Sequence, residues 1–141
     1  MISINLPNRI LYLIEYIKGL HPCPESIWLI GSQVNGTATN ESDWDILVFG
    51  SEELISTLKA QISLDNKLLD ILVVYDGNNF LNPFRKKKGS LTDWNWKKVS
   101  QDCATYCGSK WIPNEEESKR LGSTFSYGDI QESECKGVRV F

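Results

Sequence analysis

The chain has 141 residues, of which 41% are hydrophobic and 23% are charged, and its formal net charge at pH 7 is -3. This length fits one ordinary domain, and the hydrophobic share is large enough for a buried core, which excludes a chain that is disordered by default. The acidic balance excludes a protein whose whole surface binds nucleic acid, although it is compatible with a local basic patch.

The sequence lacks the marks of export and of membrane insertion. No stretch approaches the roughly 20 apolar residues that a membrane span needs. The apolar segment 10–20 is interrupted by Glu15 and Lys18, and nothing in it resembles a signal-peptide cleavage site. We therefore expect a cytoplasmic protein without a membrane partner. Its four cysteines are expected to be reduced thiols without zinc, because their spacing is poor for a zinc site: Cys23, Cys103, Cys107 and Cys135.

The first predicted element is an amphipathic helix over Pro7–Leu20. Ile10, Ile14 and Ile17 recur at helical spacing and would form its buried stripe. The helix should end before Pro22, because proline cannot continue the backbone hydrogen bonds of a helix.

Three apolar segments and a second helix follow in the chain. Strands are predicted over Ile27–Ile30, Asp45–Phe49 and Leu68–Tyr75, because these runs are apolar and partly β-branched. The intervening segment Gly31–Ser42 is rich in turn residues and should be a turn or a short irregular helix. Ser51 is predicted to cap a helix that begins there. The order helix, strand, strand, helix, strand indicates an α/β or α+β sheet that is covered by helices.

The second half of the chain is predicted to be mostly β-structure. Residues 85–89 form a basic run that should be an exposed loop. Short strands are expected over Leu91–Val99, Thr105–Ile112 and Lys136–Phe141, and the polar segment Asn114–Ser126 should be a flexible connection.

This change in composition suggests two parts. We expect residues 1–82 to form the core, and residues 83–141 to form a basic loop and a β-rich extension that packs on the core sheet or extends it. Trp94 and Trp96 alternate along the predicted strand and should face the same way. Sheet packing is the expected role of these two side chains, with stacking on nucleic-acid bases as the alternative.

The residues that indicate chemistry lie at the ends of the first two predicted strands. Gly31-Ser32 is followed by ten residues and then by Asp43-Trp44-Asp45. Two carboxylates at positions i and i+2 of an extended chain point to the same side. Their repulsion at about 4 Å is roughly 1 kcal/mol in water and about 4 kcal/mol at an effective dielectric near 20. An apolar strand tolerates such a pair when the carboxylates bind a cation or share a proton.

Magnesium and phosphate fit this pattern together. Mg²⁺ prefers oxygen ligands and leaves positions for phosphate oxygens. Gly31 permits a close approach of the backbone to a phosphate, and the Ser32 hydroxyl and the following amides can donate hydrogen bonds to it. Asp70 opens the third strand and, if it lies beside the pair, could bind a second metal or take a proton from an attacking hydroxyl.

This arrangement resembles the signature of the DNA polymerase β nucleotidyltransferase superfamily, and it is similar to small bacterial members such as minimal nucleotidyltransferases. The resemblance covers residues 7–76. It implies the α+β polymerase β-like nucleotidyltransferase fold, with a mixed sheet covered by helices. It also implies that Gly31 and Ser32 bind the triphosphate, that Asp43 and Asp45 bind both metals, and that Asp70 completes the catalytic and metal-binding triad.

The implied reaction moves a nucleoside monophosphate from ATP or another nucleoside triphosphate to an acceptor hydroxyl, with two Mg²⁺ ions as cofactors. The acceptor could be a protein side chain, a small molecule or an RNA end. One departure concerns the segment after Ser32, where the family often has arginines and this chain has Gln33, Val34 and Asn35. Phosphate binding would then be weaker or would depend on the basic residues 85–88.

Other interpretations remain open at this point. Asp43 and Asp45 could be solvated carboxylates at a strand entrance, and the basic residues 85–88 could be a solvated loop. The same fold could act without catalysis, as an antitoxin-type or immunity-type protein that binds a protein partner. A third alternative is an RNA-binding adaptor that uses the basic loop and the tryptophans, whose binding would depend strongly on salt.

Overall fold

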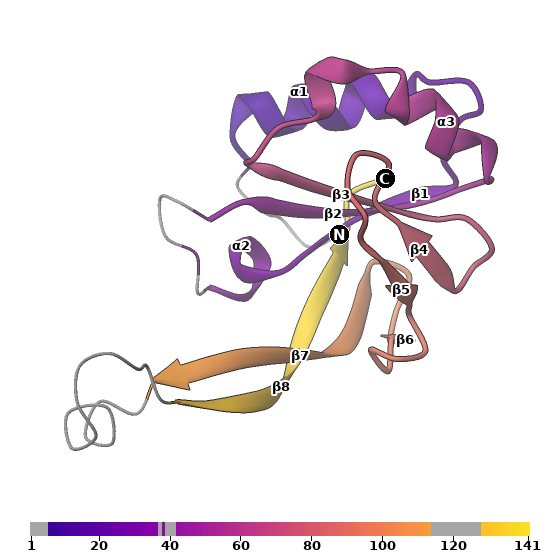
Figure 1. The fold of residues 1–141 in the computed structure, drawn as a ribbon. Coiled ribbons are helices and arrows are strands. Elements are labelled where there is room, and N and C mark those ends of the chain that lie inside the picture. The colour runs from indigo at the N-terminus through magenta and orange to yellow at the C-terminus, as the bar shows by residue number, and fades with distance from the viewer. Residues whose placement is uncertain (1–5, 37, 39–41, 114–127) are drawn as a thin grey trace.

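The fold is α+β and is built on one large mixed sheet (Figure 1). The computed structural model describes residues 6–36, 38, 42–113 and 128–141. The predicted flexible connection Asn114–Ser126 lies outside these residues. The described strands form an eight-stranded sheet in the order β5-β4-β3-β2-β1-β8-β7-β6.

The helical elements are α1 (Asn8–Lys18), α2 (Ser32–Asn35), α3 (Glu53–Lys59) and the 3-10 turn η1 (Ile62–Leu64). The strands are β1 (Ser26–Ile30), β2 (Trp44–Phe49), β3 (Leu69–Val74), β4 (Asn79–Leu81), β5 (Lys88–Ser90), β6 (Lys97–Lys98), β7 (Cys103–Pro113) and β8 (Gly128–Arg139). The three strands and the first helix predicted in residues 1–82 are thus confirmed, with their ends shifted by one or two residues. None of the described helices is long and apolar enough to cross a membrane, and a cytoplasmic location stays a prediction.

Two neighbouring strands in the interior of the sheet, β2 and β3, position the candidate site. β2 and β3 run parallel, whereas the other described strand pairs are antiparallel. On the far side of β1 the sheet continues into β8, which pairs with β1 at Trp28 and Leu29. β7 and β8 form a long hairpin that projects away from the helices (Figure 1). A single sheet therefore joins residues from both predicted parts of the chain, and the boundary at residue 82 stays a prediction.

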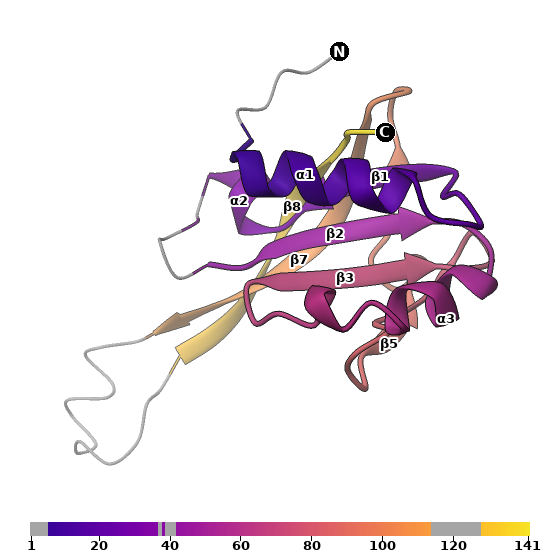
Figure 2. The same cartoon turned by 90° about the horizontal axis from the view of Figure 1, so that it is seen from above.

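Two helices cover one face of this sheet, which we call the helix face. Figure 2 shows α1 and α3 lying over β1, β2 and β3. The buried stripe of α1 includes the predicted Ile10, Ile14 and Ile17. The strands contribute every second residue to the same cluster, because side chains alternate between the two faces of a strand. The buried strand residues of this cluster are Ile27, Leu29, Trp44, Ile46, Val48, Ile71 and Val73.

The opposite face, which we call the cleft face, is covered by aromatic residues from the curled ends of the sheet. The Trp94 ring lies 4.7 Å from Phe80 and 5.8 Å from Tyr106, measured between ring centroids. Trp96 lies 5.4 Å from Trp28 and 6.0 Å from Tyr106. These are typical distances for packed aromatic pairs. Both tryptophans therefore pack against the sheet.

The predicted strand Leu91–Val99 is wrong for most of its length. Trp94 and Asn95 donate backbone hydrogen bonds to the carbonyls three positions earlier, which is a succession of turns. Asn95 adopts a φ of 54°, a left-handed conformation that asparagine tolerates better than most residues. Within this segment only Lys97–Lys98 forms a strand, so the two tryptophans reach the cleft face from a turn.

Other local predictions also need correction. The helix predicted to begin at Ser51 begins at Glu53, and no side chain caps it. The Ser51 carbonyl, and not its side chain, accepts a hydrogen bond from Leu54 N. The short strands β4 and β5 were not predicted, and β7 and β8 are longer than expected. All four cysteines are free thiols, as predicted.

Candidate active site

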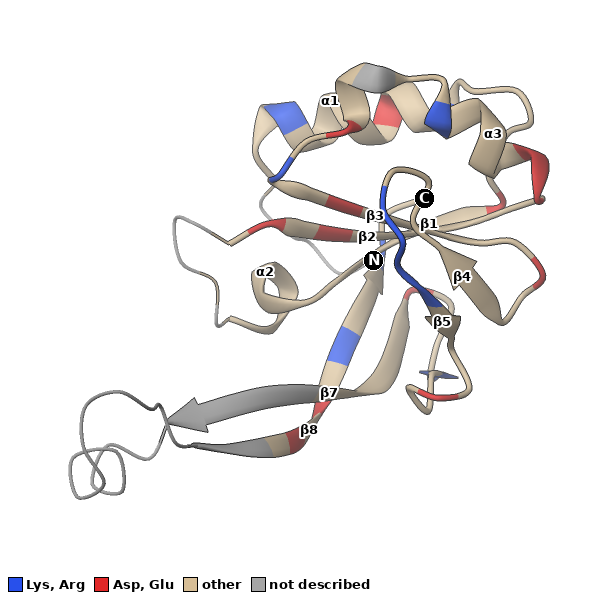
Figure 3. Ribbon diagram, viewed as in Figure 1, with Lys and Arg blue, Asp and Glu red and all other residues tan. Residues whose placement is uncertain are grey.

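The strand alternation that buries the helix face also directs two carboxylates to the cleft face. In β2, Trp44 and Ile46 pack toward the helices, so Asp45 between them points to the other side. In β3, Ile71 belongs to the helix face, so Asp70 before it also points to the cleft. The parallel register places Asp45 directly beside Asp70. Figure 3 shows these acidic positions next to each other on β2 and β3.

Asp43 joins the two strand residues because it lies two positions before Asp45. One oxygen from each carboxylate of Asp43, Asp45 and Asp70 lies within 4.8 Å of the others. Asp43 and Asp45 are partly buried, and Asp70 is buried. The structure therefore brings together the three carboxylates that the sequence singled out.

Burial and the repulsion of neighbouring carboxylates shift the pKa of Asp45. Burial raises the pKa of Asp45 to about 7, and the neighbouring charges of Asp43 and Asp70 add to this effect, whereas Lys87 opposes it. At neutral pH the Asp45 carboxyl is therefore divided between its protonated and ionised forms. A bound cation would favour the ionised form, because it would offset the repulsion.

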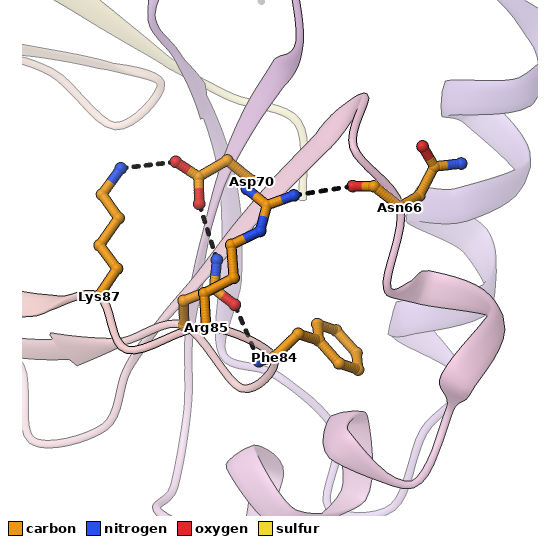
Figure 4. A network of polar contacts seen from close by, with 6 residues as sticks. Asn66, Asp70, Phe84, Arg85 and Lys87 are labelled. Carbon is orange, nitrogen blue, oxygen red and sulfur yellow. Dashed lines mark hydrogen bonds and ion pairs between the residues drawn. The ribbon is translucent and has the colours of Figure 1, made fainter.

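Asp70 is held by two side chains that the sequence did not identify as its partners. Asn82 Nδ2 donates to Asp70 Oδ1 at 2.8 Å, and Lys87 Nζ donates to Asp70 Oδ2 at 2.6 Å. Asn82 is in turn fixed by its Oδ1, which accepts a hydrogen bond from Phe84 N at 2.9 Å. Figure 4 shows this network, together with the hydrogen bond from Arg85 to Asn66 O. The sequence marks residues 85–88 as a basic run. It does not indicate that Lys87, rather than one of its neighbours in the run, contacts Asp70.

The Gly31-Ser32 turn lies against the same carboxylates. Gly31 follows β1 directly and has a φ of 80°, and a Cβ atom at this position would lie 2.0 Å from Asp45 Oδ2. Only glycine therefore permits both the backbone conformation and the close approach of the turn to Asp45. Ser32 begins the short helix α2, as predicted, and is half-buried.

The turn is fixed by residues from far along the chain. Gly31 N donates to the hydroxyl of Tyr106 in β7 at 2.8 Å, and Asn35 Nδ2 donates to Gly31 O at 2.8 Å. Asn35 also binds the backbone of Lys136 in β8. Its Nδ2 donates to the Lys136 carbonyl at 3.2 Å, and its Oδ1 accepts from the Lys136 amide at 2.8 Å. Asn35 therefore connects the turn to the β7–β8 hairpin.

Tyr106 is a positioning group in this arrangement. Burial raises the pKa of its hydroxyl to about 12, so it stays protonated at neutral pH. Its oxygen accepts the hydrogen bond of the Gly31 amide while its ring packs between Trp94 and Trp96. No local motif signals this role, because the contact joins residues that are 75 positions apart.

One cleft is lined by the Gly31-Ser32 turn together with Asn35, Asp45, Asp70, Lys87, Trp94 and Tyr106. Its volume is about 550 Å³, within the range of small-molecule sites, roughly 300 to 1,000 Å³. Its lining comes from the turn, from Asp45 and Asp70 on the strands, from Trp94 and from the β7–β8 hairpin. The lining residues from the hairpin are Tyr106, Gly108, Ser133, Glu134 and Cys135.

The comparison with protein families gives a match. The family described as polymerase beta, nucleotidyltransferase matches residues 13–95, which is more than half of the chain. Comparisons with curated proteins and with solved structures found no match. The matched range contains the Gly31-Ser32 turn, the three carboxylates and Lys87, whereas Tyr106 and the β7–β8 hairpin lie beyond it. The chain belongs to the polymerase β nucleotidyltransferase family.

Proposed function

We propose that this protein transfers a nucleoside monophosphate from ATP or another nucleoside triphosphate to an acceptor hydroxyl and releases pyrophosphate. The observation that supports this most directly is the convergence of Asp43, Asp45 and Asp70 within 4.8 Å, beside the Gly31-Ser32 turn. Membership in a nucleotidyltransferase family gives the reaction type. The acceptor class, whether protein side chain, small molecule or RNA end, is a question for experiment.

The three carboxylates fit a pair of magnesium ions. The carboxylates offer hard oxygen ligands and lie close enough to share metals. Burial and the charges of Asp43 and Asp70 raise the pKa of Asp45 to about 7, and a bound cation would lower it again. Mg²⁺ held by Asp43, Asp45 and Asp70 would polarise the reacting phosphate and lower the pKa of the acceptor hydroxyl.

The remaining groups position the substrate. The Ser32 hydroxyl and the amides of Ser32 and Gln33 would donate hydrogen bonds to the phosphate oxygens, since the amides of Val34 and Asn35 already donate to Gly31 O. Tyr106 and Asn35 would hold Gly31 in the conformation that presents these donors. The acceptor oxygen would attack the α-phosphorus while the bond to the pyrophosphate oxygen breaks. The acceptor proton would pass to a carboxylate of the cluster.

The test is label transfer from ATP that carries radioactive phosphorus at the α-position. Wild-type protein with Mg²⁺ should transfer label to one of three acceptor pools, namely protein, RNA or small hydroxyl compounds, and release pyrophosphate. Asp45→Asn should abolish transfer in every pool, because it removes one charge from the metal set. Asp65→Asn is the matched control, since Asp65 is an exposed carboxylate outside the cluster.

Binding measurements separate an inactive enzyme from a protein of another kind. Asp45→Asn should weaken the binding of Mn²⁺ and of the magnesium complex of a non-hydrolysable ATP analogue. If both affinities are unchanged in Asp45→Asn, the catalytic proposal is wrong. The chain would then be a non-catalytic binding protein on the same fold, the antitoxin-type or immunity-type alternative.

A further inference from the structure

The two oxygens of Asp70 are both in use in the metal-free protein. Oδ1 accepts from Asn82 and Oδ2 accepts from Lys87 at 2.6 Å. Each oxygen keeps one further lone pair, so a metal ion that takes Asp70 as a ligand would lie close to both partners and would be repelled by the ammonium of Lys87. The Lys87 ammonium competes most directly with the metal ion, because it already places a positive charge beside Oδ2.

The surroundings of the two partners decide which one can leave. Asn82 is 2% exposed, and its own side-chain oxygen is held by the Phe84 amide. The Lys87 side chain is 50% exposed, whereas that of Asp70 is 7% exposed. The Lys87 backbone is anchored, since its carbonyl accepts from Asn82 N at 2.8 Å, so only the long side chain needs to move.

The place to which Lys87 can move is the cleft. Lys87 lines it together with Ser32 and Asp45, and it is the one basic residue among the described residues that do so. A triphosphate in this cleft is strongly anionic, and an ammonium group binds phosphate oxygens as a point charge. In Figure 3 the basic segment that leads into β5 crosses in front of the sheet, to the right of the acidic segments of β2 and β3.

We propose that Lys87 exchanges partners during substrate binding: it neutralises Asp70 in the metal-free protein and contacts the phosphates of the nucleoside triphosphate once metal occupies the carboxylates. This inference rests on the proposed function, because it requires both metal and nucleotide in the same cleft. Lys87 would then have two opposite effects. It would weaken the binding of metal in the absence of nucleotide, and it would strengthen the binding of the metal–nucleotide complex.

The experiment measures these two effects separately in Lys87→Met. Free Mn²⁺ is titrated into the protein without nucleotide and followed by its electron paramagnetic resonance signal. Without the competing ammonium, Lys87→Met should bind Mn²⁺ at least about threefold more tightly than wild type. In the presence of Mg²⁺, calorimetry with α,β-methylene ATP should show binding weakened by about tenfold or more, because a phosphate contact is lost.

Two further variants control the result. Lys86→Met removes an exposed charge one position away and should change both affinities by less than about twofold. Lys87→Arg keeps the charge, so its Mn²⁺ affinity should stay near wild type. If Lys87→Met is unstable in a thermal melt, the titrations are performed with Lys87→Gln, for which the same two shifts are expected.

The outcomes distinguish this inference from the proposed function. If wild type binds neither Mn²⁺ nor the nucleotide analogue, the proposed function fails and the inference fails with it. If wild type binds both, but Lys87→Met shifts the two affinities in the same direction or shifts neither, the inference alone is overturned. Lys87 would then be a structural partner of Asp70.

Discussion

The helix face and the cleft face of the sheet use the same strands for different purposes. Within β2, Ile46 packs against the helices and is 0% exposed, whereas Asp45, the residue before it, faces the cleft beside two other carboxylates. The helix face is aliphatic and closed by α1 and α3. The cleft face combines aromatic residues with charges that repel one another. A shift of one position along the strand therefore separates groups that stabilise the fold from groups of the candidate site.

The largest effect is expected on the helix face. Ile46→Ala should lower the free energy of unfolding by about 2 to 5 kcal/mol, because it leaves a cavity in a fully buried aliphatic cluster. Urea unfolding followed by circular dichroism measures this loss. A loss below about 1 kcal/mol, within the range of an exposed substitution, would contradict the assignment of this face as the main source of stability.

The next effect is expected where the cleft face is tightest. Gly31→Ala places a Cβ atom 2.0 Å from Asp45 Oδ2 at a φ of 80°. It should lower the free energy of unfolding by about 1 to 3 kcal/mol through backbone strain, and displace Asp45 from its place beside Asp43 and Asp70. Mn²⁺ affinity should therefore fall as well.

The control for this variant is Gly36→Ala. Gly36 has a similar φ of 78°, but a Cβ atom there would have nothing within 4 Å. This variant should show backbone strain without loss of Mn²⁺ affinity. Equal Mn²⁺ affinities for the two alanine variants would argue against the contact between Gly31 and Asp45 as a determinant of the site.

A smaller effect is expected for Tyr106→Phe. The ring packing is kept, but the Gly31 amide loses its acceptor, which should cost about 1 kcal/mol of unfolding free energy. Because the turn is then less well fixed, nucleotide affinity should fall by more than this stability change explains. Calorimetry with the ATP analogue tests this, with Tyr12→Phe as the control at a position that is 80% exposed. Unchanged nucleotide affinity in Tyr106→Phe would remove Tyr106 from the positioning groups.

The smallest stability effect, and the one of opposite sign, is expected for Asp45→Asn in metal-free protein. The Asp45 pKa rises from its ordinary value of 3.8 to about 7 in the folded protein. Between pH 4 and pH 7 the native state therefore keeps a proton on Asp45 that the unfolded chain has released. The free energy of unfolding consequently falls as pH rises through this range. Asp45→Asn should remove that decline and be neutral or mildly stabilising at pH 8. Urea titrations from pH 4.5 to pH 8 with chelator would show the difference, and parallel pH profiles for the two proteins would refute it.

The part of the fold that could be predicted is the part with local periodicity. The buried stripe of α1 and the apolar runs of β1, β2 and β3 identify themselves by spacing, and the i, i+2 rule then directs Asp43 and Asp45 to one side. The segment 91–99 misled the prediction, because alternating tryptophans suggest a strand while the left-handed Asn95 bends the chain into turns.

The part of the site that could not be predicted depends on long-range contacts. Asn35 is unremarkable in sequence and is placed by its bonds to Lys136, and Tyr106 is placed by its bond to the Gly31 amide. Lys87 sits in a run of four basic residues, and only the tertiary structure selects it as the partner of Asp70. The periodicity of a sequence predicts which side of a helix or strand is buried, but it does not predict which helices and strands that are distant in the chain contact each other.

The pair of hydrogen bonds between Asn35 and the Lys136 backbone has a consequence for the order in which the molecule folds. Its two residues are 101 positions apart, so closing it requires a large loss of chain entropy, and contacts of such separation form late. During synthesis the three carboxylates and Gly31 emerge well before Tyr106 and Lys136, and β1 keeps an unpaired edge until β8 arrives. A nascent chain that has reached residue 95 therefore contains the whole family signature but lacks the two strands that fix its turn. We expect nucleotide affinity to be the last property that the refolding protein regains, after the helices have formed.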